Sequence, residues 1–236
     1  MIRRAIAVLG LALLAGPAAA LTPFVARYEV WVDGKRQGVS QMRLTDLGNG
    51  LWRHEIEAEG TAGMARLLDA ELQQSSEFRL VDARPQPQQA RQRMASLLRE
   101  REVITHFDWQ RGEARWSGDV KPDRRGPLPL SADAITDALL NLCLGLDCNQ
   151  PAGTWLRYQR YERGKAMPVA YRIGARETIR VPLGERSAVP LRWQDDGGKR
   201  TTTAWYAADL PPTPLRVQRE EDGRVRYELR LLEVAR

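Results

Sequence analysis

Apolar and polar residues alternate with a period of two along most of this chain, and this pattern limits the fold more than any other feature. In residues 24–32, FVARYEVWV, the side chains of Phe24, Ala26 and Tyr28 share one face of an extended strand, because successive side chains point to opposite faces. Similar segments recur to the C-terminus, separated by turn residues such as Asp33-Gly34. The pattern predicts a mainly β protein, a curled antiparallel sheet (a half-barrel or open barrel) of about a dozen strands.

One segment has helical character instead. Residues 132–144, ADAITDALLNLCL, follow Ser131, which is a suitable N-cap, and Asp133 would favour the positive end of the helix dipole. We therefore expect one firm helix over residues 132–144, packed against the sheet. A second, short helix or an irregular crossing is expected within residues 61–72.

The chain has only two cysteines, Cys143 and Cys148, at the end of this helix. In an unbroken helix the Cα atoms of residues five apart are about 8 to 9 Å from each other, beyond the roughly 7 Å that a disulfide can bridge. Gly145 is suited to ending the helix between them, so the spacing predicts a short disulfide. Free thiols and a metal site are the alternatives, although the C-x-x-C spacing of redox pairs is absent.

The N-terminus has the three parts of a secretory signal peptide. Arg3 and Arg4 precede a short apolar run, and Ala18-Ala19-Ala20 offers small residues for cleavage. We expect a signal peptide over residues 1–20, cleavage near Ala20, and one antiparallel β domain over residues 21–236. An exported, periplasmic protein is indicated, and no later segment is apolar enough for a transmembrane segment.

Composition adds little to this. The formal net charge is +6 and no run of five basic residues occurs, so a nucleic-acid partner is not indicated. His54 lies on the apolar face of its strand and His106 on a polar face, and no nucleophile elbow, phosphate-binding loop or metalloprotease motif accompanies them. Asp133 and Asp137 are four apart but are more simply a dipole partner and a solvated face. The sequence therefore predicts no catalytic residue, no metal and no cofactor.

The seven tryptophans are the remaining candidates for a binding site. Trp31 belongs to the more polar face of its strand, where a core role would not place it. A sheet curled around a cavity could offer such rings to an apolar ligand; the alternative is that they cover a core poor in phenylalanine. The candidate ligand-binding residues are Trp31, Trp52, Trp109 and Trp205.

Several segments together resemble a bacterial family of exported proteins, the domain of unknown function numbered 3108. They are PFVARYEVWVDGKRQG near the expected mature start, HFDW at residues 106–109, LPLSADAITDALLNL, and the ending TAWYAADLPPTPLRVQREEDGRVRYELRLLEV. The family implies no activity or catalytic residues, and CLGLDC is not a feature associated with it. AWYAADLPPTPLRV is also similar to the closing strands of periplasmic lipoprotein carriers, which implies a half-barrel around a helical lid.

These observations favour a non-enzymatic periplasmic protein that holds a lipid or another apolar small molecule on the concave face of its sheet. The alternative is a structural or interaction module that contacts another envelope protein through a sheet edge or a basic face.

Overall fold

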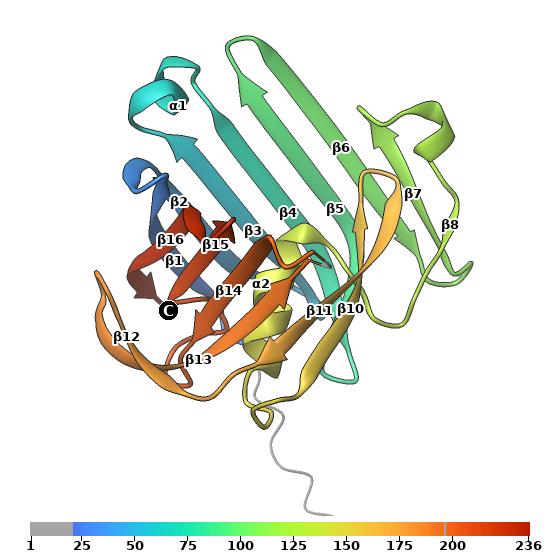
Figure 1. Ribbon diagram of the computed structural model, residues 1–236. Helices are drawn as coiled ribbons and strands as arrows, with labels where there is room; N and C mark the ends of the chain where they lie inside the picture. Colours follow the sequence, from blue (N-terminus) through green and yellow to red (C-terminus); the bar gives the residue numbers. More distant parts are fainter. Residues whose placement is uncertain (1–20, 196) are drawn as a thin grey trace, which may run out of the picture.

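The computed structural model describes residues 21–195 and 197–236, so the expected signal peptide over residues 1–20 lies outside the described residues. Within the described residues, sixteen strands form one sheet that curls without closing (Figure 1). Strand β1 lies at its centre and pairs antiparallel with both β2 and the C-terminal strand β16. The predicted curled antiparallel sheet is confirmed.

The strands form two arms on either side of β1. The first arm contains β1 (Phe24–Val32), β2 (Lys35–Gly48), β3 (Leu51–Gly60), β4 (Glu71–Val81), β5 (Arg84–Ser96), β6 (Arg99–Asp108), β7 (Glu113–Gly118) and β8 (Leu128–Pro129). The second contains β9 (Ala134–Ile135), β10 (Trp155–Glu162), β11 (Lys165–Ile173), β12 (Glu177–Val181), β13 (Gly184–Gln194), β14 (Arg200–Tyr206), β15 (Arg216–Glu221) and β16 (Arg224–Ala235). The expected number of strands was lower, partly because β8 and β9 have only two residues each.

Three short helices complete the described part of the chain: α1 (Gly63–Leu67), the 3-10 helix η1 (Pro122–Arg124) and α2 (Asp137–Asp147). The last lies within the curl of the sheet (Figure 1). It buries Leu139 and Leu142 in the same hydrophobic cluster as Phe24 and Phe78. His54 joins this packing, since its Nδ1 donates a hydrogen bond to the carbonyl oxygen of Ala138, 2.6 Å away.

The predicted helix boundaries, 132–144, were wrong at both ends. Thr136 is the N-cap, and its Oγ1 accepts a hydrogen bond from the backbone N–H of Leu139 at 3.2 Å. The preceding residues are extended, because β9 pairs with β10 in parallel. Ser131 is not a cap; its backbone N–H donates to the hydroxyl of Tyr161.

The predicted disulfide was also wrong, because both cysteines are free and buried. Helix α2 does not end at Gly145 but continues to Asp147. A cysteine pair five residues apart on a continuous helix cannot reach bonding distance. Gly145 serves another purpose: a Cβ atom on it would lie 2.8 Å from Cα and from the carbonyl carbon of Pro212. Glycine is therefore required for close packing, not for ending the helix.

Thiol labelling should distinguish this arrangement from a disulfide. Without reductant, the folded protein should react with very little maleimide, whereas denatured protein should react at two thiols per chain. Burial is the main reason that the pKa of both thiols is raised, and a protonated thiol is a poor nucleophile. Denatured protein that reacts only after reduction would contradict the free-thiol structure.

Candidate functional site

Part of the concave face stays open because helix α2 is shorter than the strands it covers. Its 11 residues span about 16 Å, whereas the 14 residues of β2 can extend about 46 Å. The half that faces α2 carries large side chains such as Leu44 and Phe78. Beyond the helix the sheet offers Gly38, Ala58 and Gly60 instead, and such small residues leave space above the strands.

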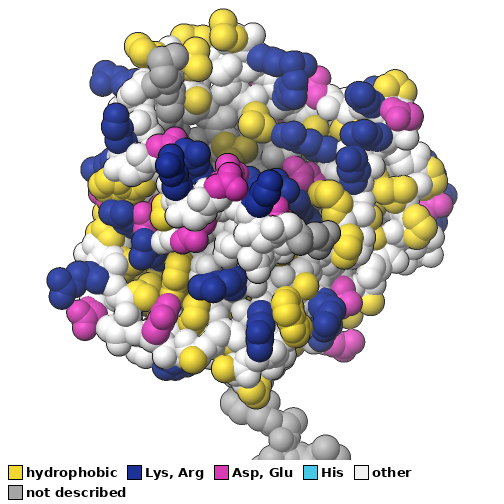
Figure 2. Space-filling model, viewed as in Figure 1, with side chains coloured by type: hydrophobic (Ala, Val, Ile, Leu, Met, Phe, Trp, Pro, Cys, Tyr) yellow, Lys and Arg dark blue, Asp and Glu magenta, His cyan; other side chains and the backbone are white. Residues whose placement is uncertain are grey.

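This space is a groove with a volume of about 500 Å³, within the range of roughly 300 to 1,000 Å³ for small-molecule sites. Its lining is mainly apolar and includes Val30, Val32, Leu72 and Met94. Figure 2 shows a hollow on this face, with hydrophobic atoms inside it and both basic and acidic side chains around it. We call the space lined by these residues, with Ala58 on its floor, the concave groove.

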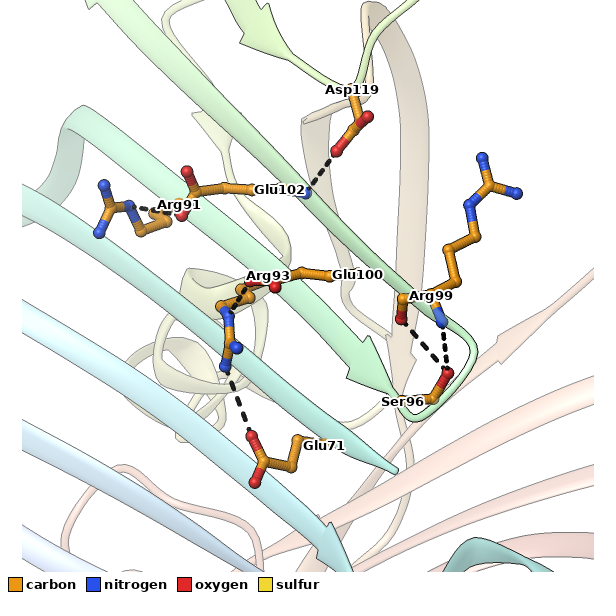
Figure 3. A network of polar contacts seen from close by, with 8 residues as sticks. All are labelled: Glu71, Arg91, Arg93, Ser96, Arg99, Glu100, Glu102 and Asp119. Atoms are coloured by element: carbon orange, nitrogen blue, oxygen red, sulfur yellow. Dashed lines mark hydrogen bonds and ion pairs between the residues drawn. The ribbon is translucent and has the colours of Figure 1, made fainter. Parts of the chain in front are cut away.

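Three arginines, Arg99, Arg101 and Arg163, also line the concave groove. The first two, on β6, make no ion pair with any carboxylate of the described residues. By contrast, arginines on the convex face of the neighbouring strand β5 are neutralised (Figure 3). Arg93 contacts Glu100 at 2.6 Å and Arg91 contacts Glu102 at 3.2 Å. Glu59 and Glu71 also line the groove, and Glu71 pairs with Arg93 at 3.4 Å. The groove therefore combines mainly apolar walls with charged groups of both signs at its rim.

A polar cluster closes one end of the groove, where the β10–β11 turn crosses β5. Arg163 donates to the side-chain oxygen of Gln92 at 3.3 Å. Nearby, Arg160 pairs with Asp137 at 3.4 Å and with Glu162 at 3.3 Å. Burial raises the pKa of Asp137, and the adjacent Glu162 carboxylate raises it further. The cavity beside this cluster is only about 30 Å³, room for a water molecule and too little for an organic substrate.

The four candidate tryptophans do not meet in one place, and none is among the described residues that line the concave groove. Trp31 and Trp205 lie on the convex face, under the guanidinium groups of Arg230 and Arg216 at 4.2 and 5.4 Å. Both arginines also form ion pairs with the buried carboxylate of Glu228. Trp31 thus occupies the polar face that its sequence position indicated, but it stacks on an arginine there.

The other two tryptophans pack beside separate parts of the core. Trp52 lies against the cluster that contains α2. Trp109 lies against a second cluster under the β10–β11 hairpin, and its indole N–H donates to the carbonyl oxygen of Pro87 at 2.7 Å. A role for any of the four in binding a ligand stays a prediction.

The two histidines differ in environment, as their strand positions indicated. His54 is buried, and burial lowers its pKa to about 4, so it is a neutral hydrogen-bond donor at neutral pH. His106 is exposed on β6. Within residues 21–195 and 197–236, no three His, Cys, Asp or Glu side chains are placed to hold a metal ion. The same part of the chain contains no helix long and apolar enough to cross a membrane.

The groove residues were missed because single strands do not reveal them. Val30, Leu72 and Met94 belong to the apolar phases of β1, β4 and β5, which look alike whether a helix covers them or not. One signal was available. Gly38 and Gly60 stand opposite each other on β2 and β3, and glycines inside strands often mark a place where something approaches the sheet closely.

Fold and groove together define a class: an open antiparallel half-barrel whose concave face is partly filled by one helix. The chain belongs to the family described as protein of unknown function, DUF3108, which matches residues 25–230. Among curated proteins nothing matches the chain.

One solved structure supports the fold. A β-barrel-like protein of domain of unknown function DUF1849 from Brucella abortus is 10% identical, with a TM-score of 0.54 over 91% of this chain and 98% of that one. A protein from Parabacteroides distasonis, described as "a putative lipoprotein", is 11% identical, with a TM-score of 0.34 over 90% of this chain and 95% of that one. The second likeness is too weak to argue from, and the first shows the fold alone.

Proposed function

We propose that this protein is an exported, non-enzymatic binder of a lipid-like molecule in the bacterial periplasm, formed by one β domain after removal of residues 1–20. The concave groove carries the proposal: it is apolar, open to solvent and about 500 Å³ in volume. An acyl chain would lie along Val30, Leu72 and Met94, where burying apolar surface contributes roughly 25 cal/mol per Å². The sequence features of a signal peptide support the location.

The arginines of the groove support an anionic head group. A carboxylate or phosphate beside Arg99 or Arg101 would meet a cation without a carboxylate partner in the described chain, and charge-assisted hydrogen bonds to guanidinium are the stronger kind. The competing function is a structural or interaction module that contacts another envelope protein through a sheet edge or a basic face, and its basic face gains less support. On the convex face of β3 to β6 the arginines are largely paired with glutamates, as in Arg53–Glu77.

Filling the groove should weaken ligand uptake. Delipidated wild-type protein should bind a fluorescent fatty acid at micromolar concentration, and Ala58→Phe should weaken binding at least ten-fold, because the ring occupies the space of the chain. Ile104→Phe adds a ring to the convex face of β6 and is the matched control, expected to bind as wild type. The measurement is a fluorescence titration, with thermal melting to show that each variant folds. Wild-type protein that takes up no fatty acid, or Ala58→Phe protein that binds normally, would contradict the proposal.

A further inference from the structure

The β5–β6 turn places two leucines in water at one end of the sheet. Leu97 is 70% exposed and Leu98 82%, and Leu67 in α1 is 68% exposed. The two segments are joined, because the backbone N–H of Leu97 donates to the carbonyl oxygen of Leu68 at 2.9 Å. They form one end of the molecule, at the top of Figure 1, and Figure 2 shows hydrophobic atoms there with lysine or arginine on either side. We call Leu67, Leu97 and Leu98 the leucine tip.

Leucines are not required by the geometry of this turn. Four other two-residue turns in the sheet carry polar residues and glycine with positive φ: Asp33-Gly34, Asn49-Gly50, Arg163-Gly164 and Asp222-Gly223. The β5–β6 turn instead is held by Ser96, whose Oγ accepts from the backbone N–H groups of Leu98 and Arg99 at 3.3 and 3.2 Å. Polar residues would serve equally well at its two central positions, so the exposed leucines need another explanation.

The charges around the leucine tip indicate what would cover it. Arg66 precedes Leu67, and Arg99 follows Leu98, with Arg101 next on the same face. None of these three arginines is in an ion pair with a carboxylate of the described chain. In Figure 3 the side chain of Arg99 points away from the paired Arg93 and Glu100. Exposed leucines flanked by unpaired arginines match the two layers of an anionic bilayer surface, acyl chains below and phosphates above.

We infer that the leucine tip and its arginines bind the surface of an anionic lipid bilayer. The position of the concave groove agrees with this, because Met94, Ser96, Arg99 and Arg101 line the groove next to the tip. A bilayer on the tip would therefore lie at the groove's mouth. The tip shares Arg99 and Arg101 with the groove, but its three leucines are not among the described residues that line the groove. The test therefore changes the leucines and needs no ligand in the groove.

Vesicle flotation tests this inference with the full-length mature protein. Wild type should float with phosphatidylcholine vesicles that contain phosphatidylglycerol, and far less with phosphatidylcholine alone. Leu97→Ser/Leu98→Ser, which changes no charge, should lower the bound fraction at least five-fold. Arg66→Glu/Arg99→Glu should lower it as much, and added salt should weaken wild-type binding.

The matched control is Leu80→Ser/Val81→Ser. These exposed apolar residues (37% and 43%) lie at the opposite end of β4, and their loss should leave flotation unchanged. Equal flotation of the Leu97→Ser/Leu98→Ser variant and wild type would overturn the inference, as would equal binding to both kinds of vesicle. Fatty-acid titration of the same leucine variants should match wild type, so that failure of the bilayer surface and failure of the groove can be told apart.

Discussion

Between pH 7 and pH 4 the Asp137→Asn variant is expected to lose about 3 kcal/mol of unfolding free energy through His54. In the folded protein, burial lowers the pKa of His54 to about 4, whereas the unfolded chain titrates near the ordinary value of about 6.5. The unfolded state therefore binds the proton first. The contribution of His54 to the unfolding free energy is fully present above the pKa of the unfolded state. It is lost as the pH falls toward the pKa of the folded state, and each unit of difference between the two pKa values corresponds to about 1.4 kcal/mol.

The His54→Asn variant should show the opposite slope. The pKa of Asp137 is raised, chiefly by burial and then by Glu162, so the folded state binds a proton more tightly than the unfolded state. Protonation then stabilises the fold, and stability rises as the pH falls from neutral toward the ordinary carboxyl range near 4. Asparagine keeps a donor near the position of Nδ1, which preserves the bond to Ala138. In wild type the two contributions oppose each other.

Urea unfolding at pH 7, 6, 5 and 4 would measure both slopes, with wild type, the two single variants and the double variant compared. Carboxylates common to all four proteins contribute equally to the pH dependence of each unfolding free energy, so their contributions cancel when the proteins are compared. His106→Asn, at an exposed position on β6, is the control and should follow wild type. If both single variants had the wild-type slope, neither group would be buried as described.

Local patterns in the sequence were sufficient to predict the class of fold. Alternation in residues such as Phe24, Ala26 and Tyr28 depends only on the geometry of one strand, and turn dipeptides such as Asp33-Gly34 act within four residues. The curl follows once one face is apolar over many strands, since that face must be covered. The family resemblance agreed with this interpretation.

Features that depend on distant segments were not predictable in this way. Trp31 stacks on Arg230, and Arg27 pairs with Glu233 across 206 positions, because β1 and β16 meet only in the folded sheet. The extent of the groove depends on where α2 ends relative to ten-residue strands such as β3. The first residue of α2 could not be predicted from the local sequence, since both Ser131 and Thr136 are acceptable N-caps. Pairing of β9 with β10 decides in favour of Thr136.

Gly145 is the residue for which local and distant requirements differ most, and Gly145→Ala is expected to destabilise the protein by about 2 kcal/mol. Helix propensity alone predicts the reverse, a gain of up to about 1 kcal/mol, because alanine is the better helix former. The added Cβ, however, would lie 2.8 Å from two backbone atoms of Pro212, so α2 or residues 211–214 must move. That movement would disturb Leu142 and Leu215, both fully buried, and Gly145→Val should cost more than alanine.

Two further variants identify the cause of this loss. Gly197→Ala is the control, because a Cβ there meets no described atom within 4 Å, and its unfolding free energy should stay within about 0.5 kcal/mol of wild type. Pro212→Ala should not rescue Gly145→Ala, since the close atoms Cα and the carbonyl carbon remain. Chemical unfolding at neutral pH measures wild type and each of these variants. A Gly145→Ala variant more stable than wild type would mean that α2 does not approach the 211–214 segment closely, so that the better helix propensity of alanine prevails.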